Sequence, residues 1–284
     1  MTLAEVLVAT ALALSIVGGV IAAVAPAQGA FATQQERVDL EQRLRVAVET
    51  IARDVRAAAS VRPYRIGAIA DDGRAGVFYR EDTLSVRFAA PLPGEPAGDS
   101  SRTYYLRASD AASQLMRYDG GAAAFPVLDD LVLLAFEYFG AVQPPQIIVD
   151  EEGPRTTYGP MPPLLDADDP ADSWGPGENC AFAVIGGVRQ SRLAAVEGDD
   201  RPLAPSMLTD GPWCPDAAAE DRFDADLLRV RRVRVRLRLQ APPPFRGRAG
   251  AFFFRAGTAG DPRRHVPDQE IRVDVALRNW SAGW

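Results

Sequence analysis

Lysine is missing from this 284-residue chain, histidine occurs once and cysteine twice. A typical structural zinc site takes about four Cys or His ligands, so this inventory cannot build one. A hydrolase centre of the Ser-His-Asp or Cys-His type would have to use His265, which lies between two prolines in Asp261–Pro267. We interpret this segment as a loop, with His265 facing solvent. The chain is therefore not expected to be an enzyme.

Acidic residues outnumber basic residues, which gives the chain a formal net charge of −7. An acidic chain is a poor default partner for nucleic acids or anionic lipids. One cationic row, Arg232, Arg234, Arg236 and Arg238, alternates with apolar residues as in a strand. Like charges on one strand face repel each other unless acids lie across from them. We expect acids on neighbouring strands to pair with this row, and nucleic acid to be an unlikely partner.

No charged residue occurs between Val6 and Gln35, and apolar residues dominate Val6–Ala25. About 20 such residues span a bilayer as a helix. A cleaved secretory signal begins with Lys or Arg, whereas the first five residues here carry only an acid, Glu5. A plain membrane anchor gains nothing from that acid, which costs about 2.5–3.5 kcal/mol deep in a bilayer. An assembly helix explains Glu5, and the other two interpretations stay open as alternatives.

The first nine residues, Met1-Thr2-Leu3-Ala4-Glu5-Val6-Leu7-Val8-Ala9, resemble the mature N-terminus of type IV pilins and type II secretion pseudopilins. In that family, prepilin peptidase removes a leader and residue 1 is N-methylated. The acid at position 5 neutralises the terminal amine of a neighbouring subunit. The resemblance implies that Met1 and Glu5 are assembly residues and that the sequence is in processed form. Ala4 departs from the larger aliphatic residue that is common there.

A second helical half follows the apolar one. Apolar residues at three- and four-residue steps predict an amphipathic helix to about Ser60, ended by Arg62-Pro63: Leu40, Leu44, Ala47, Val48, Ile51, Val55 and Ala58. Glu41, Arg45, Glu49 and Arg53 form a charge ladder that we interpret as a solvated face. Gly18-Gly19 and Pro26 predict a kink near Pro26. The expected division is 1–30, 31–62 and a globular head, 63–284.

Short alternating runs without helical patterns between them predict an antiparallel sheet in the head. One long helix on such a sheet gives an α+β fold. Leu228 and Val230 are out of phase with Val233–Leu239, which predicts a bulge near Arg231. The expected strands are Gly76–Arg80, Thr83–Ala90, Arg102–Ala108, Ser113–Tyr118, Leu131–Phe139, Ile147–Val149, Ala181–Ile185, Leu228–Leu239, Ala251–Phe254 and Glu270–Leu277.

Parts of the head extend the resemblance. Thr103–Leu106, Gln114–Gly121, Leu131–Phe139 and Val275–Asn279 look like the head of large PilW-type minor pilins, with the minor pseudopilin J of type II secretion as the nearest relative. The segment 143–222 is rich in Pro, Gly and acids. It is expected to be a long irregular loop region with a short helix at Asp216–Asp224.

Both cysteines, Cys180 and Cys214, lie in that irregular region. In an exported protein, two cysteines are most simply one disulfide. Closing a loop of about 35 residues would stabilise the fold by roughly 3–4 kcal/mol in the chain-entropy model. Two free buried thiols are the alternative.

Acidic residues cluster in the same region. Calcium takes six to eight oxygen ligands, which closely spaced carboxylates can supply. The spacing does not match the EF-hand loop, so a solvated acidic loop is the simpler interpretation and no cofactor is expected. The cluster consists of Asp166, Asp168, Asp169, Asp172 and Glu178.

The pairs Asp129-Asp130 and Asp199-Asp200 are sequence neighbours that would point to opposite faces of a strand, so they are not expected to do acid–base work.

Taken together, the sequence predicts a structural subunit, a minor pilin or pseudopilin that primes or caps a pilus-like or secretion filament. It would sit in the bacterial inner membrane by a single helix, with its head in the periplasm, and then enter a surface filament with other pilins. The alternatives are the main repeating subunit of the filament, an adhesin that uses 143–222 as its ligand surface, and an exported hydrolase on an anchor.

Overall fold

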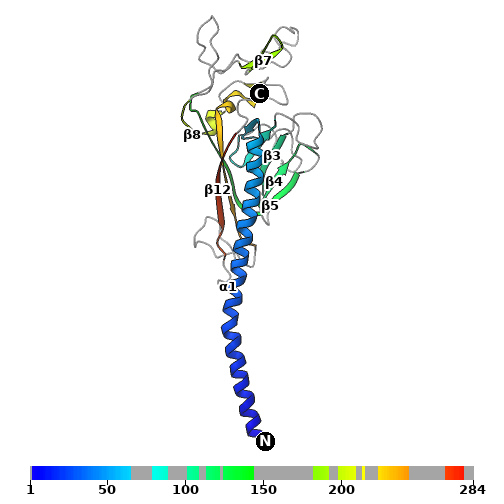
Figure 1. Ribbon diagram of the computed structural model, residues 1–284, viewed down its shortest axis with the longest axis vertical. Coiled ribbons are helices and arrows are strands. Elements are labelled where there is room, and N and C mark those ends of the chain that lie inside the picture. Colours follow the sequence, from blue (N-terminus) through cyan, green and yellow to red (C-terminus); the bar gives the residue numbers. More distant parts are fainter. Residues whose placement is uncertain are drawn as a thin grey trace.

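One helix, α1 (Leu3–Ala57), runs through 55 residues without interruption. Its first half projects as a bare rod and its second half lies along the head (Figure 1). α1 ends three residues before the predicted position, because Ser60–Arg62 forms a strand instead. The computed structural model describes residues 2–64, 79–88, 101–108, 113–121, 124–143, 182–191, 198–208, 213–214, 223–242 and 266–277.

A single antiparallel sheet forms the body of the head, in the order β1-β2-β3-β4-β5-β11-β12, with β8 paired to the end of β5. The predicted α+β class is confirmed. The strands are β1 (Ser60–Arg62), β2 (Thr83–Arg87), β3 (Ser101–Arg107), β4 (Ser113–Tyr118), β5 (Ala124–Gly140), β8 (Arg201–Leu203), β11 (Val230–Leu239) and β12 (Gln269–Ala276).

Smaller elements interrupt the region that was expected to be irregular. β6 (Phe182–Ile185) and β7 (Val188–Ser191) form a hairpin whose two turn glycines both have positive φ. β9 (Trp213–Cys214) pairs with β10 (Phe223–Asp224), and two 3-10 helices, η2 (Pro205–Leu208) and η3 (Ala225–Arg229), follow β8 and β10.

Several predicted elements differ from the structure or lie outside the described residues. Phe223–Asp224 is a strand, although a helix was predicted to end there, because it pairs with β9. Leu228 and Arg229 belong to η3 and not to the following strand. Tyr79 and Arg80 are described but are not in a strand. The ranges 76–78, 147–149, 216–222 and 251–254 lie outside the described residues.

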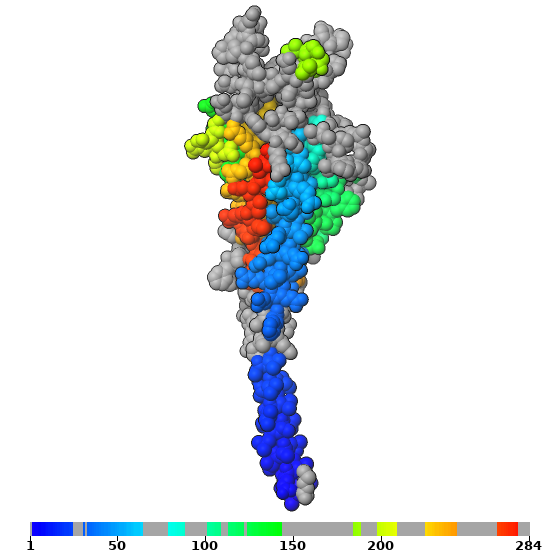
Figure 2. Space-filling model, in the orientation of Figure 1, coloured from blue at the N-terminus to red at the C-terminus, as the bar shows by residue number. Residues whose placement is uncertain are grey.

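The core lies between α1 and one face of the sheet. The predicted apolar face of α1 is buried, and it packs chiefly on β12, β11 and β5. Figure 2 shows α1 and β12 side by side along the head. The helix residues at no more than 2% exposure are Leu40, Leu44, Ala47, Ile51, Ala52 and Val55, and Ala58, the residue that caps the C-terminus of the helix, is fully buried. Sheet residues opposite them include Phe136, Val233, Val235 and Leu237.

The predicted bulge is present where β11 begins. Its pairing with β5 shifts register between Val230 and Arg232, which brings both Val230 and Val233 onto the buried face. The main chain comes unusually close there. A Cβ on Gly140 would lie 1.8 Å from the carbonyl oxygen of Arg229. Only glycine fits this position, so the bulge and Gly140 together fix the β5–β11 register.

Candidate assembly surface

The first half of α1 is an exposed apolar surface. Leu3–Val24 is long and apolar enough to cross a membrane, and none of it is buried against the rest of the molecule. Its large apolar side chains are 44% (Val24) to 83% (Leu3) exposed. A contiguous apolar surface of this extent marks a protein or membrane interaction site. The rod in Figure 2 that projects from the head carries this surface.

The side chain of Glu5 helps to cap the N-terminus of α1. Its carboxylate oxygen Oε2 accepts a 2.7 Å hydrogen bond from the Thr2 amide, while the Glu5 amide donates at 3.4 Å to the Thr2 hydroxyl. This reciprocal capping box satisfies backbone donors that a helix start otherwise leaves without partners. No role was predicted for Thr2. The Thr-x-x-Glu spacing at the head of an apolar run is the signal that identifies it.

A buried ionic contact fixes the second half of α1 on the sheet. Asp54 is 5% exposed, and its two oxygens accept hydrogen bonds from Arg102 at 2.8 Å and from the Tyr104 hydroxyl at 2.5 Å. Burial and the neighbouring Asp54 carboxylate raise the pKa of Tyr104, so its hydroxyl stays a donor. Because a buried carboxylate without partners is costly, the contact defines where along the sheet the helix rests.

A second contact lies nearer the end of the head from which the apolar half of α1 projects. Arg43 donates to the carbonyl oxygen of Asp129 at 3.2 Å and lies 4.0 Å from the Asp130 carboxylate. Asp130 has a φ of 58°, in the left-handed region that residues other than glycine rarely adopt. Partial burial and the charges of Asp39 and Asp130 raise the pKa of Glu36, and Arg43 offsets part of that rise.

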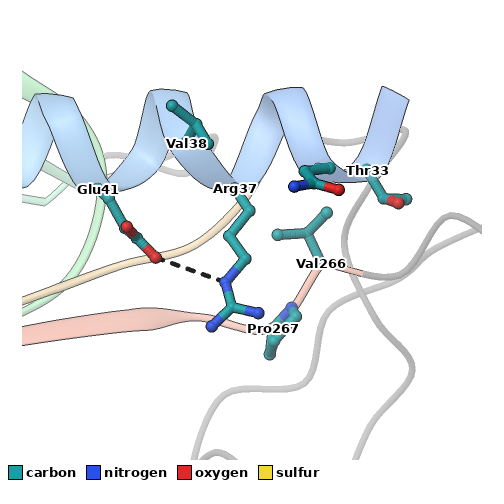
Figure 3. Close-up of a pocket in the computed structure, with 7 residues that line it drawn as sticks. Thr33, Arg37, Val38, Glu41, Val266 and Pro267 are labelled. Carbon is teal, nitrogen blue, oxygen red and sulfur yellow. Dashed lines mark ion pairs between the residues drawn. The ribbon is translucent and has the colours of Figure 1, made fainter. Parts of the chain in front are cut away.

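A groove of about 510 Å³ opens where α1 leaves the head (Figure 3). Arg37 pairs with Glu41 at 3.4 Å and both are well exposed, so the charges in the groove already satisfy each other. No nucleophile, acid–base pair or metal-ligand set converges there among the described residues. The groove is lined by Thr33, Gln34, Arg37, Val38, Glu41, Val266 and Pro267.

The arginine row of β11 has the predicted acidic partners. Arg232 and Arg234 pair with Asp274 at 2.6 and 2.7 Å, Arg236 with Glu137 at 3.0 Å and Arg238 with Glu270 at 3.9 Å. The hydrogen bond from Arg234 lowers the pKa of Asp274. The guanidinium groups of Arg232 and Arg234 also lie 4.1 and 4.7 Å from the centre of the Phe139 ring. On this face of the sheet, each arginine of the row is therefore already paired with an acidic side chain.

The two neighbouring Asp pairs have structural partners as well. Asp129 accepts a 2.6 Å hydrogen bond from Gln114, and Asp130 faces Arg43. Asp200 lies 3.4 Å from Arg231, and Asp199 lies 3.9 Å from Arg201. Within the described part of the chain, no group of three or more His, Cys, Asp or Glu residues could hold a metal ion.

Other predicted site residues fall where the structure gives no test. Met1, Cys180, His265 and the acidic cluster Asp166, Asp168, Asp169, Asp172 and Glu178 lie outside the described residues. Of Cys214, only the main chain in β9 is described. The disulfide and the calcium site therefore stay predictions.

Comparison with known proteins adds little to this geometry. No protein-family model matches the chain, and no curated protein matches it. Among solved structures, the chain is similar to a type IV-like pilin from Thermus thermophilus. The two share 12% sequence identity over 85% of this chain and 98% of that chain, with a TM-score of 0.33. A likeness at this level carries no argument about function, which rests on the helix and its surroundings.

Proposed function

We propose that the chain is a structural subunit of a pilus-like or secretion filament, held in the inner membrane by Leu3–Val24 before assembly. One observation carries the proposal: the apolar first half of α1 is continuous with a second half that is anchored to the head, and an acid stands at its start. A helix that only anchored the protein would not need that acid, whereas a bundle of such helices needs a charge partner at each N-terminus.

The proposed contact joins Glu5 of one subunit to the N-terminal amine of Met1 of a neighbour, which we propose is methylated after prepilin peptidase acts. Inside an apolar bundle, a carboxylate is stabilised only when it is paired and hydrogen-bonded. The capping bond from the Thr2 amide occupies part of the Glu5 carboxylate. An ionised carboxylate has about four acceptor sites, so capping and pairing are compatible.

Three substitutions separate charge from helix capping. Glu5→Gln keeps a side chain that caps the Thr2 amide but removes the charge. Glu5→Asp keeps the charge on a shorter side chain, and Glu5→Val removes both functions. We expect membrane insertion to persist in all three. Incorporation into filaments should fall strongly for Gln and Val and be intermediate for Asp.

The measurement is the ratio of sheared-filament protein to membrane protein for each variant, in cells that otherwise assemble normally. Equal incorporation of wild type and Glu5→Gln would refute the charge role of Glu5. Absence of the wild-type chain from filaments would refute the filament role itself.

Within this class, we propose a minor position, at which the subunit primes or caps the filament. The long 143–222 region supports a rare position, since a main subunit must stack many copies tightly. The number of copies per filament in purified material tests this: a count close to that of the main subunit would favour the repeating role. An adhesin remains the second candidate, supported by the hairpin β6–β7, whose tip residues Ile185 and Val188 are exposed at the end of the molecule away from α1's N-terminus (Figure 1).

A further inference from the structure

The hairpin β6–β7 stands apart from the main sheet. Its two strands pair with each other, and neither pairs with any other strand that the structure describes. The hairpin lies at the end of the molecule opposite to the N-terminus of α1 (Figure 1). A two-stranded hairpin is at best marginally stable by itself in water, so the residues at its tip are not there to build a core.

The turn of the hairpin carries two apolar side chains next to each other. Gly186 and Gly187 have positive φ values of 61° and 78°, as a tight two-residue turn requires. This turn pairs Ile185 directly with Val188, which places both residues on one face at the end of the hairpin. Ile185 is 58% exposed and Val188 is 63% exposed. A hairpin that ended in water would carry polar residues at these two positions.

The charge around this apolar end has one sign. No residue from Asn179 to Val188 is charged. The first charged residue after the turn is Arg189, which the β6–β7 pairing places directly opposite Val184, and Arg192 follows in the sequence. No acidic residue occurs from 179 to 196, although acids outnumber basic residues in the chain as a whole. The hairpin therefore combines an apolar end with a locally cationic sequence.

This arrangement has the dimensions of a contact with a bilayer surface. A strand rises about 3.3 Å per residue, so Arg189 follows the apolar pair at about that distance along the hairpin. With Ile185 and Val188 at the boundary between headgroups and acyl chains, Arg189 comes level with the headgroups. Arginine at that level is attracted by anionic lipids. A soluble anionic ligand would account for the arginines and not for the apolar pair, whereas a lipid surface accounts for both.

We propose that the hairpin inserts Ile185 and Val188 into the surface of a bilayer that carries anionic headgroups. This bilayer is not the one that holds Leu3–Val24, because the hairpin and the N-terminus of α1 lie at opposite ends of the molecule (Figure 1). The chain would then contact two lipid surfaces, one through each end. The inference goes beyond the filament role and does not depend on it, since a single chain carries both ends.

Binding of the full-length chain to a second bilayer tests the proposal. The chain is held by α1 in nanodiscs of phosphatidylcholine. It is mixed with vesicles of phosphatidylcholine alone or of phosphatidylcholine with phosphatidylglycerol, and empty nanodiscs serve as the blank. Flotation should recover about tenfold more protein with the anionic vesicles, and added salt should lower that recovery. No recovery, or equal recovery with the two kinds of vesicle, would overturn the proposal.

Substitutions at the tip test whether the apolar pair makes the contact. Ile185→Glu and Val188→Glu should each lower recovery by about tenfold or more, because the new carboxylate would enter the boundary of an anionic bilayer. Ile185→Leu keeps an apolar side chain and should bind as the wild type does. The matched control is Val142→Glu, which adds the same charge at an exposed valine outside the hairpin. Wild-type recovery of Ile185→Glu would overturn the proposal.

Photolabelling identifies the part of the chain that meets the lipid. The anionic vesicles carry a phospholipid with a diazirine in its acyl chain, and mass spectrometry locates the adducts on the protein. We expect adducts within Phe182–Ser191. Adducts confined to Leu3–Val24 would show that α1 had entered the vesicles, and would overturn the tip contact. No filament is needed here, so a negative result leaves the filament role standing, and absence of the chain from filaments leaves the tip contact standing.

Discussion

The hydroxyl of Tyr104 on β3 donates a 2.5 Å hydrogen bond to the buried carboxylate of Asp54 on α1. Arg102, two residues before Tyr104, holds the other oxygen of the same carboxylate. These two hydrogen bonds to Asp54 hold the helix against the sheet. Because α1 is continuous, they also orient its apolar half relative to the head.

The head is expected to fold without the apolar half of the helix. Among the residues of α1 whose burial is described, Leu40 is the first buried one, and the large apolar side chains before it are exposed. A fragment from Thr33 to Trp284, called the head fragment, should be soluble, folded and monomeric. Gel filtration and circular dichroism check this. Persistent aggregation under oxidising conditions would show that the core needs residues before Thr33.

Tyr104→Phe should destabilise the head fragment by about 1–3 kcal/mol, because Asp54 loses a buried donor. Tyr138→Phe is the matched control. Its hydroxyl donates only a long 3.4 Å bond to the neutral carbonyl of Thr83, so its loss should be about 1 kcal/mol or less. Urea unfolding measures both. Equal losses would show that Tyr104 contributes through packing and not through Asp54.

Gly140→Ala should cost about 3 kcal/mol or more, or prevent folding, because the new methyl group would overlap the main chain at Arg229. The same carbonyl accepts from the Ala141 amide at 3.3 Å, so it cannot move away without losing that bond. Gly121→Ala meets no atom within 4 Å and should change stability by less than about 0.5 kcal/mol. A wild-type melting curve for Gly140→Ala would contradict the close approach at the bulge.

Glu36→Gln should raise the melting temperature of the detergent-solubilised chain at pH 7. The pKa of Glu36 is raised by partial burial and by Asp39 and Asp130. The folded state therefore binds this proton more tightly than the unfolded state does, and stability falls as pH rises through the raised pKa. The gain from Gln should shrink towards pH 4. The exposed Glu49→Gln should show no gain, and a gain independent of pH would contradict the electrostatic cause.

Cys180 and Cys214 are predicted to form a disulfide in the exported protein. Mass spectrometry of a non-reduced digest should then find the two peptides linked. Complete alkylation of both thiols without a reductant would refute the pairing.

Much of the fold follows from local patterns. The phase break between Val230 and Val233 predicted the bulge because strand sides alternate strictly, and five of the expected strands lie within about two residues of their predicted positions. The extension of β5 over 124–130 was not predicted, because Pro126 and the acids Asp129 and Asp130 interrupt the run of strand-forming residues. Asp130 does adopt a turn-like φ of 58°, but its neighbours still pair with β4.

The assembly surface was only half predictable. Glu5 stands out because a lone acid at the edge of an apolar run is costly. Asp54 could have been noticed as an acid within a buried stripe, but its partners lie about 50 residues away in sequence.

The unbroken course of α1 has a mechanical consequence. In a bilayer that holds Leu3–Val24, the 22 residues span about 33 Å, and Thr33, where the groove beside Val266 and Pro267 begins, lies about 14 Å further along the axis. The head is thus carried on a short, stiff stalk. In such a bilayer, a tilt of the helix would tilt the head with it, because α1 runs from the apolar half into the head without a break in its helical structure.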